Sequence, residues 1–265
     1  MIRDIVFVGA GNLATNVAQA LREVGYNIKQ VYSRTRESAS RLATSVDAEA
    51  VADIEQIVDR ADLYIVSVKD SALEEVVGKL CNGKRSGLFV HTAGSVPVDV
   101  FNTLTPRYGV FYPMQSFSKQ RRVDFTEVSF FIEANSKEDT QELLALGKSL
   151  GKNVYELSSE ARKHLHLAAV FACNFANHCF ELSAEVLSKY GIPFDVMLPL
   201  IDETARKVHS VSPLKAQTGP AVRYDENVIA MQEKLLSDAP RLLDIYDKMT
   251  NSIHYVATNG DNDNK

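Results

Sequence analysis

A stripe of polar residues interrupts an apolar helical segment in the second half of the sequence. His166, Asn174 and His178 stand at multiples of four residues in the stretch LHLAAVFACNFANHCF, and His166 and Asn174 are expected to share a helix face. Polar side chains in such a segment either find hydrogen-bond partners in a core or line a cavity. Because histidine titrates near neutral pH, His166 is a candidate proton donor, with Asn174 as its orienting partner. A purely structural role for both is the alternative.

Four further candidates for the reacting centre stand beside expected strands or helices. His91 ends one apolar run, Ser95 follows it in HTAGS, and Gln115 lies at the end of the run VFYPMQSF. Ligands of open α/β sheets bind outside the carboxyl ends of the strands, which is where these residues are expected. Thr218 belongs to the polar turn QTGP before a helix. For His91, Ser95 and Thr218 the alternative is an ordinary strand end or helix cap.

A glycine-rich turn near the start of the sequence predicts a binding site for a dinucleotide. The apolar run IVFV at 5–8 is followed by Gly9, Gly11 and Ala14 and then by a helical pattern. The first glycine permits a tight turn, the second lets the backbone approach a pyrophosphate, and the small alanine allows close helix–strand packing. The free N–H groups and the dipole of the helix then attract the anion. The residues predicted to hold it are Gly9, Gly11, Asn12 and Leu13.

The end of the second expected strand selects the kind of dinucleotide. Residues 28–32 lead into Ser33, Arg34 and Thr35, where an NAD site would place an acidic residue for the ribose hydroxyls. The guanidinium of Arg34 instead suits a 2′-phosphate, with hydrogen bonds from the two hydroxyls. These residues favour NADP(H) over NAD(H) and weaken an S-adenosylmethionine interpretation; the alternative is that Arg34 is a solvated charge. Lys69, after another apolar run, is expected near the cofactor.

The order of elements predicts an α/β fold with a helical second domain. Strands alternate with helices up to about residue 158, which is typical of a doubly wound, mostly parallel Rossmann sheet. Residues 159–257 show helical patterns only, and 258–265 are expected to be a disordered tail. The apolar surface of the helix at 160–190 predicts a homodimer through the helical domain. The expected strands are 5–8, 28–32, 63–68, 87–91, 110–117, 128–134 and 153–157, and the expected helices include 138–150, 160–190, 194–209, 225–237 and 239–256.

Composition restricts the partners. The 265 residues carry a net charge of −5, which disfavours nucleic acid and anionic membranes and leaves a small-molecule substrate. No apolar run approaches the ~20 residues of a spanning helix, and the first residues do not resemble a signal peptide, so we expect a cytoplasmic protein. Three cysteines without ligand spacing, and two histidines three turns apart, predict no metal site.

Several fragments together resemble a known family. They are similar to Rossmann-like proteins with a DUF2520 domain, described as NADP oxidoreductases, and more distantly to pyrroline-5-carboxylate reductase and to 6-phosphogluconate and 3-hydroxyisobutyrate dehydrogenases. The resemblance implies an NADP-binding domain, a dimerising helical domain and an active-site cleft between them. The fragments are GAGNLA at 9–14, SRT at 33–35, HTAGS at 91–95, YPMQSF at 112–117, LHLAAVFACN at 165–174 and TGPAVRYD at 218–225.

One departure from the dehydrogenases limits the expected chemistry. In those relatives a lysine precedes an asparagine by four residues on the long helix, whereas here Lys163 is followed by Leu167. The acid–base chemistry of those hydroxyacid dehydrogenases is therefore not expected here, and His166 with Asn174 is a different pair that suits an imine or a ketone. We expect an NADP(H)-dependent oxidoreductase that transfers hydride to or from a small imine or carbonyl metabolite. The alternatives are a non-catalytic NADP-binding protein and a deazaflavin (F420)-linked NADP reductase.

Overall fold

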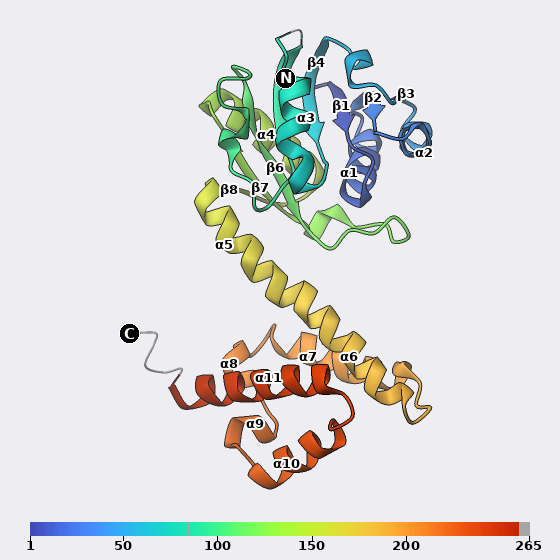
Figure 1. Cartoon of the computed structure of the whole chain (residues 1–265). Coiled ribbons are helices and arrows are strands. Elements are labelled where there is room, and N and C mark those ends of the chain that lie inside the picture. The colour runs from blue at the N-terminus through green and yellow to red at the C-terminus, as the bar shows by residue number, and fades with distance from the viewer. Residues whose placement is uncertain (84, 260–265) are drawn as a thin grey trace. The chain divides into compact units, whose positions relative to one another are not determined.

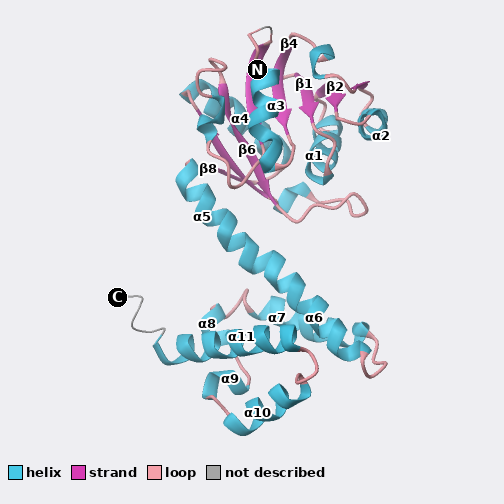
Figure 2. Ribbon diagram, in the orientation of Figure 1, coloured by secondary structure: helices cyan, strands magenta, loops and turns pink. Residues whose placement is uncertain are grey.

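The computed structural model describes residues 1–83 and 85–259, which form two compact units. The first unit spans Met1–Asn174, and the second begins at Phe175. The described part of the first unit contains an eight-stranded sheet, whose strands lie side by side from β8 on the left to β3 on the right in Figures 1 and 2. The strands are β1 (Asp4–Val8), β2 (Asn27–Tyr32), β3 (Glu49–Val51), β4 (Arg60–Val66), β5 (Ser86–His91), β6 (Tyr108–Met114), β7 (Ser129–Ala134) and β8 (Asn153–Glu156).

The sheet has the order β3-β2-β1-β4-β5-β6-β7-β8. All neighbouring strands are parallel except β6 and β7, which are antiparallel. The strand order reverses between β1 and β4, so that a ligand-binding crevice is expected at their carboxyl ends. This arrangement confirms the predicted doubly wound, mostly parallel sheet. The helices of the unit that connect its strands are α1 (Asn12–Glu23), α2 (Arg36–Ser45), α3 (Asp70–Leu80) and α4 (Lys137–Leu150).

Two apolar layers explain why the central strands are apolar throughout. Ile5 and Phe7 of β1 pack on the side of α1, α2 and α4, whereas Val6 and Val8 pack on the side of α3. Because side chains alternate between the faces of a strand, a strand covered on both faces needs apolar residues at every position. This is the pattern that made β1, β4 and β5 recognisable. β3 was not predicted because its three residues, Glu49–Val51, are too short a run to show any period.

A long helix leads from the first unit into the second. It comprises α5 (Ser159–Ala169), a π-helical turn (Val170–Phe175) and α6 (Ala176–Ser188). The predicted domain boundary precedes this helix, whereas the compact units divide inside it, after Asn174. The physical reason is that the start of α5 is bound to the sheet: Arg162 donates to Glu133 of β7 at 2.6 Å.

The described part of the second unit contains helices joined by turns and no strand, as predicted. Thr258 and Asn259 lie in its last helix, so the predicted disordered tail was wrong for these two residues, and the rest of that tail lies outside the described residues. The short helices α8 and α9 were not predicted, because one turn shows no period. The α-helices that follow α6 are α7 (Leu198–Lys207), α8 (Pro213–Ala216), α9 (Pro220–Arg223), α10 (Glu226–Leu235) and α11 (Pro240–Asn259).

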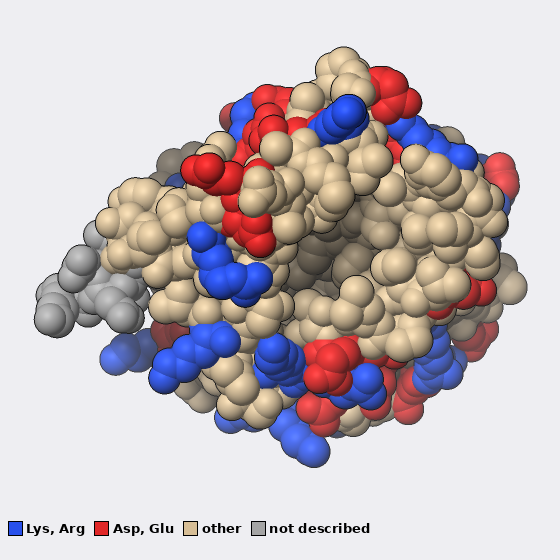
Figure 3. Space-filling model, turned by 90° about the horizontal axis from the view of Figure 1, so that it is seen from below, with Lys and Arg blue, Asp and Glu red and all other residues tan. Residues whose placement is uncertain are grey.

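The second unit has a small apolar core and much exposed apolar surface. Ala221, Ile229 and Leu242 are its buried apolar residues among those the structure describes, while Leu200 and Leu235 are 63% and 64% exposed. Figure 3 shows one face of the molecule, with charged side chains gathered around an uncharged hollow. Over the described residues, no helix combines the length and the apolar character needed to cross a membrane.

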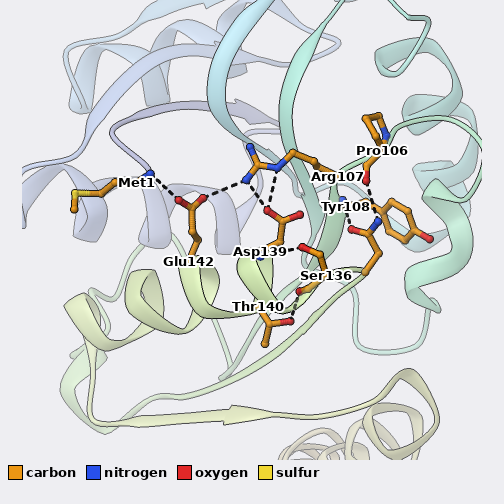
Figure 4. A network of polar contacts seen from close by, with 9 residues as sticks. Met1, Pro106, Arg107, Tyr108, Ser136, Asp139, Thr140 and Glu142 are labelled. Atoms are coloured by element: carbon orange, nitrogen blue, oxygen red, sulfur yellow. Dashed lines mark hydrogen bonds and ion pairs between the residues drawn. The ribbon is translucent and has the colours of Figure 1, made fainter.

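A polar network fixes the antiparallel strand pair at the start of β6 (Figure 4). Arg107 donates to the buried carboxylate of Asp139 from Nε at 3.0 Å and from Nη2 at 2.5 Å, and to Glu142 at 3.3 Å. The hydroxyl of Ser136 caps α4 by accepting from the backbone N–H of Asp139 at 3.1 Å. The side-chain amide of Asn135 bonds the backbone of 106 and 108, one bond to each. These contacts join α4 to the start of β6 and to the turn that follows β7.

Candidate functional site

A cavity of about 810 Å³ opens at the carboxyl ends of β1, β2, β4, β5 and β6, within the first unit. Its size lies in the usual range for ligand and cofactor sites. Tyr112, Gly94, Asp70 and Ser38 also line it, although sequence reasoning gave none of them a role. The predicted site residues that line it are Gly9, Gly11, Asn12, Leu13, Ser33, Arg34, Lys69, Gln115 and His166.

The glycine turn has the geometry that a pyrophosphate site requires. Gly9 has φ +123°, and a Cβ there would lie 2.0 Å from the carbonyl oxygen of Ser67, so only glycine fits beside β4. A Cβ on Gly11 would meet no atom within 4 Å, which leaves room for a ligand against the backbone. Gly11 is also the N-cap of α1, without a side-chain cap and with no acidic residue in the first turn. The first N–H groups of α1 are therefore free for an anion.

The end of the cavity between β2 and α2 carries a cation and two hydroxyls. Ser33, Arg34 and Ser38 line it, and Arg34 makes no hydrogen bond with another described residue. Thr35 does not line the cavity: it caps α2, accepting from the N–H of Ser38 at 3.4 Å and donating to the Ser38 hydroxyl at 2.8 Å. The predicted contact of Thr35 with a phosphate stays a prediction. Ser38, in the first turn of α2, has a hydroxyl that lines the cavity in its place.

Two asparagines of α1 bind the loop that follows β6. Asn12 donates to the carbonyl of Phe117 at 3.1 Å, and the buried Asn16 donates to the carbonyl of Ser118 at 3.0 Å. The loop therefore lies against the phosphate-binding turn, and its residue Gln115 reaches the cavity. The side-chain oxygen of Gln115 accepts from the next backbone N–H at 2.8 Å, so its amide nitrogen is the group left for a ligand.

His91 is buried beside the cavity and does not line it. Its Nδ1 accepts from the N–H of Ala93 at 3.1 Å, and its Nε2 lies 3.4 Å from the carbonyl of Pro97. Burial, with the nearby Arg162 cation as a further cause, lowers the pKa of His91 to about 3. The ring is therefore neutral, with the proton on Nε2, and both nitrogens are engaged. In this structure His91 holds the loop after β5, and its catalytic role stays a prediction.

The loop after β5 is also held from two other elements. Ser95 is exposed and outside the cavity lining, and its hydroxyl donates to Asp70 at the start of α3. Arg162 of α5 donates to the carbonyl of Val96 at 2.6 Å. Sequence reasoning missed Arg162, which is fully buried; its signal was a charged residue one turn before His166 on the same helix face.

His166 lines the cavity and bonds Tyr112. Its Nδ1 lies 3.0 Å from the Tyr112 hydroxyl, and the two rings meet edge to face at a centroid distance of 6.1 Å. A Cβ on Gly94 would lie 2.5 Å from the same nitrogen, so glycine leaves space for the imidazole. Burial is the main cause that raises the pKa of the Tyr112 hydroxyl. The site thus pairs a protonated phenol with an imidazole.

The structure does not bring Asn174 to the cavity. Asn174 lies in the π-helical turn Val170–Phe175 and is exposed. A π turn accommodates one residue more than an α turn, so the helix face predicted from an α-helical period does not extend past Val170. Thr218 belongs to the second unit, where it precedes α9. The roles of Asn174 and Thr218 stay predictions.

The fold and the site define a class, the two-unit proteins with a Rossmann dinucleotide-binding domain. Residues 4–93 match the family described as NADP oxidoreductase coenzyme F420-dependent, and residues 128–253 match the domain of unknown function DUF2520. A "putative NADP oxidoreductase" of known structure from Bacteroides fragilis is 57% identical, over 96% of this chain and 98% of that one, with a TM-score of 0.92. The chain belongs to this family, the Rossmann-like proteins with a DUF2520 domain, as the sequence fragments predicted.

More distant solved structures share the fold. A protein from Thermotoga maritima is 21% identical over 96% of this chain and 99% of that one, with a TM-score of 0.81. An imine reductase from Myxococcus stipitatus in complex with NADP+ is 16% identical over 97% and 95% of the two chains, with a TM-score of 0.69. A comparison with curated proteins gave no match.

Proposed function

We propose that the protein is an NADP(H)-dependent oxidoreductase that acts on a small imine or carbonyl metabolite. The observation that supports this most strongly is one cavity that joins a pyrophosphate-type glycine turn, the guanidinium of Arg34 and the Tyr112–His166 pair. The family relation to an NADP oxidoreductase and the fold shared with an NADP+-bound imine reductase agree with it.

The residues of the cavity fit NADP(H) along its length. Gly9, Gly11 and the first N–H groups of α1 would hold the pyrophosphate. Gly11 has no Cβ and the space beside it is open, so a phosphate can approach the backbone there. Arg34 and Ser33 would hold the 2′-phosphate, with Ser38 as a further donor. When bound, the nicotinamide supplies or accepts the hydride. His166 would supply or accept the accompanying proton, and Gln115 would orient the substrate.

We also propose a cytoplasmic homodimer formed through the helical unit. A unit with few buried apolar residues and several large exposed ones gains stability when a second copy covers that surface.

A calorimetric titration with NADPH and NADH tests the cofactor. A charge-assisted phosphate contact is worth ~1.5–3 kcal/mol, so the protein should prefer NADPH by roughly 10- to 100-fold. Arg34→Ala should lose most of this preference. Arg36→Ala removes a neighbouring charge that does not line the cavity and should retain it. Equal affinity for NADPH and NADH would contradict the assignment of Arg34.

Oxidation of NADPH with a panel of imines and carbonyls tests the reaction. His166→Gln should lower turnover at least 100-fold and leave the NADPH affinity within about twofold, because general acid–base catalysis contributes roughly 10²- to 10⁴-fold. NADPH binding without turnover of any panel member would favour a non-catalytic NADP-binding protein. Exchange of reducing equivalents with a deazaflavin instead would favour the F420-linked reductase.

A further inference from the structure

The two ring nitrogens of His166 have different surroundings, and only the use made of its proton rests on the proposed function. A neutral imidazole carries its proton on either Nδ1 or Nε2, and the hydrogen bond at one nitrogen decides which. His166 has one such hydrogen bond, between Nδ1 and the Tyr112 hydroxyl at 3.0 Å. Among the described residues, none bonds its Nε2.

Tyr112 is placed to donate in this hydrogen bond. Its side chain is 7% exposed, on β6 in the wall of the cavity. Burial raises the pKa of its hydroxyl, so the phenol keeps its proton at neutral pH. A phenol that keeps its proton and faces a neutral imidazole is satisfied best when it donates to an unprotonated ring nitrogen.

The backbone at Gly94 closes the other side of Nδ1. A Cβ on this residue would lie 2.5 Å from Nδ1 and 2.7 Å from Cγ of the ring. The Nδ1 edge is therefore enclosed by the β5 loop and by Tyr112, whereas the ring as a whole lines the cavity. Nε2 is the nitrogen that this arrangement leaves for a ligand.

Arg162 fixes the position of the part of α5 that carries His166. It stands four residues before His166, on the same helix face. It is fully buried, and it donates to Glu133 of β7 and to the carbonyl of Val96, each at 2.6 Å. The helix face that carries His166 is thus attached to both the sheet and the β5 loop one turn before the cavity.

We propose that Tyr112 and Gly94 are positioning residues that hold neutral His166 as the Nε2–H tautomer, so that Nε2 is the atom that exchanges a proton with the substrate. In the direction of reduction, the Nε2–H bond breaks as a proton moves to the substrate atom that becomes an N–H or O–H group. The Tyr112 O–H bond breaks in the same step as its proton moves to Nδ1, so that the imidazole stays neutral and the phenol becomes a phenolate. A solvent proton then returns to Nε2 while Nδ1 gives its proton back to Tyr112, and in oxidation each of these transfers is reversed.

Nitrogen NMR of ¹⁵N-histidine-labelled protein at pH 8 tests the tautomer without substrate. The His166 signal, assigned by its loss in His166→Gln, should show a protonated Nε2 and an unprotonated, hydrogen-bonded Nδ1. In Tyr112→Phe the ratio of Nε2–H to Nδ1–H should fall by roughly 3- to 10-fold, as the loss of one neutral hydrogen bond implies. Gly94→Ala should disturb the Nδ1 signal although the tyrosine is present.

A matched control separates this effect from general damage to the strand. Tyr108→Phe removes a hydroxyl from the same strand, outside the cavity lining, and should leave the His166 signals unchanged. A wild-type His166 protonated on Nδ1, or a Tyr112→Phe protein with an unchanged tautomer ratio, would overturn the proposal. An NADPH titration of the same samples separates the proposed tautomer from the proposed oxidoreductase function. A wild type that shows the expected tautomer but binds no NADPH would contradict the proposed function and leave the tautomer proposal standing.

Discussion

At the scale of single residues, two histidines with similar sequence contexts have opposite environments. His91 follows an apolar strand and His166 lies in an apolar helix, and sequence reasoning assigned both to the reacting centre. His91 is fully buried, with both ring nitrogens engaged by the backbone, and His166 lines the cavity. Burial and hydrogen-bond partners, which depend on neighbouring strands and loops, give the two histidines these different environments.

The buried His91 predicts an acid-sensitive fold. Its pKa is about 3 in the folded protein, against an ordinary value near 6.5, so between these values the unfolded chain binds a proton that the folded chain does not. The stabilising contribution is complete above pH ~6.5 and is lost as the pH falls toward 3. We expect the free energy of unfolding to decrease by roughly 1–3 kcal/mol more between pH 7 and 4 than in His91→Gln.

Urea unfolding of the wild type and of His91→Gln at pH 7, 5 and 4 measures this difference. His164→Gln is the control, because His164 is exposed on α5 and its removal should leave the pH dependence unchanged. An equal loss of stability with acid in wild type and His91→Gln would show that other groups cause it.

At the scale of elements, the loop after β6 is held in place by a helix. Asn16 is 6% exposed on α1 and donates to the carbonyl of Ser118, and Asn12 one turn earlier donates to Phe117. Because this hydrogen bond is partly buried, losing its donor costs about 1 kcal/mol. We expect Asn16→Ala to open the loop more often, so that trypsin cleaves after Lys119 or Arg121 at least fivefold faster.

Limited proteolysis followed by mass spectrometry locates these cleavages. Gln19→Ala changes the same helix one turn later, where the side chain contacts Ser45 instead of the loop, and should cleave at the wild-type rate. A wild-type rate in Asn16→Ala would mean that other contacts hold the loop. Because Gln115 belongs to it, we expect bound NADPH to slow the cleavage.

At the scale of the whole molecule, the two units differ in how their apolar residues are distributed. The first unit has two continuous apolar layers, whereas the described part of the second buries few apolar side chains. We expect light scattering to give twice the 29.3 kDa of one chain, and Leu200→Asp on α7 to increase the monomer fraction at least tenfold. Glu203→Ala, an exposed change on the same helix, should remain dimeric. A monomeric wild type would contradict the proposed dimer.

The sequence by itself determined the class of fold and the residues of the phosphate-binding turn. The phosphate-binding turn was predictable because its geometry depends only on adjacent residues, namely the apolar run at 5–8, Gly9 and Gly11. Parallel strands covered on both faces are continuous apolar runs, so β1, β4 and β5 were visible in the sequence. The longer helices of the second unit, α7, α10 and α11, were visible for the same reason, since a helical period is a local pattern.

Only the tertiary structure decided which polar residues meet. Tyr112, Gly94 and His166 come from β6, the loop after β5 and α5, and the sequence contains no signal that joins these three segments at one nitrogen. The π-helical turn before Asn174 shifts the helix face that an α-helical period predicts. Sequence spacing describes neighbours along one element, whereas a reacting centre is made where several elements pack together, and packing follows from the whole fold.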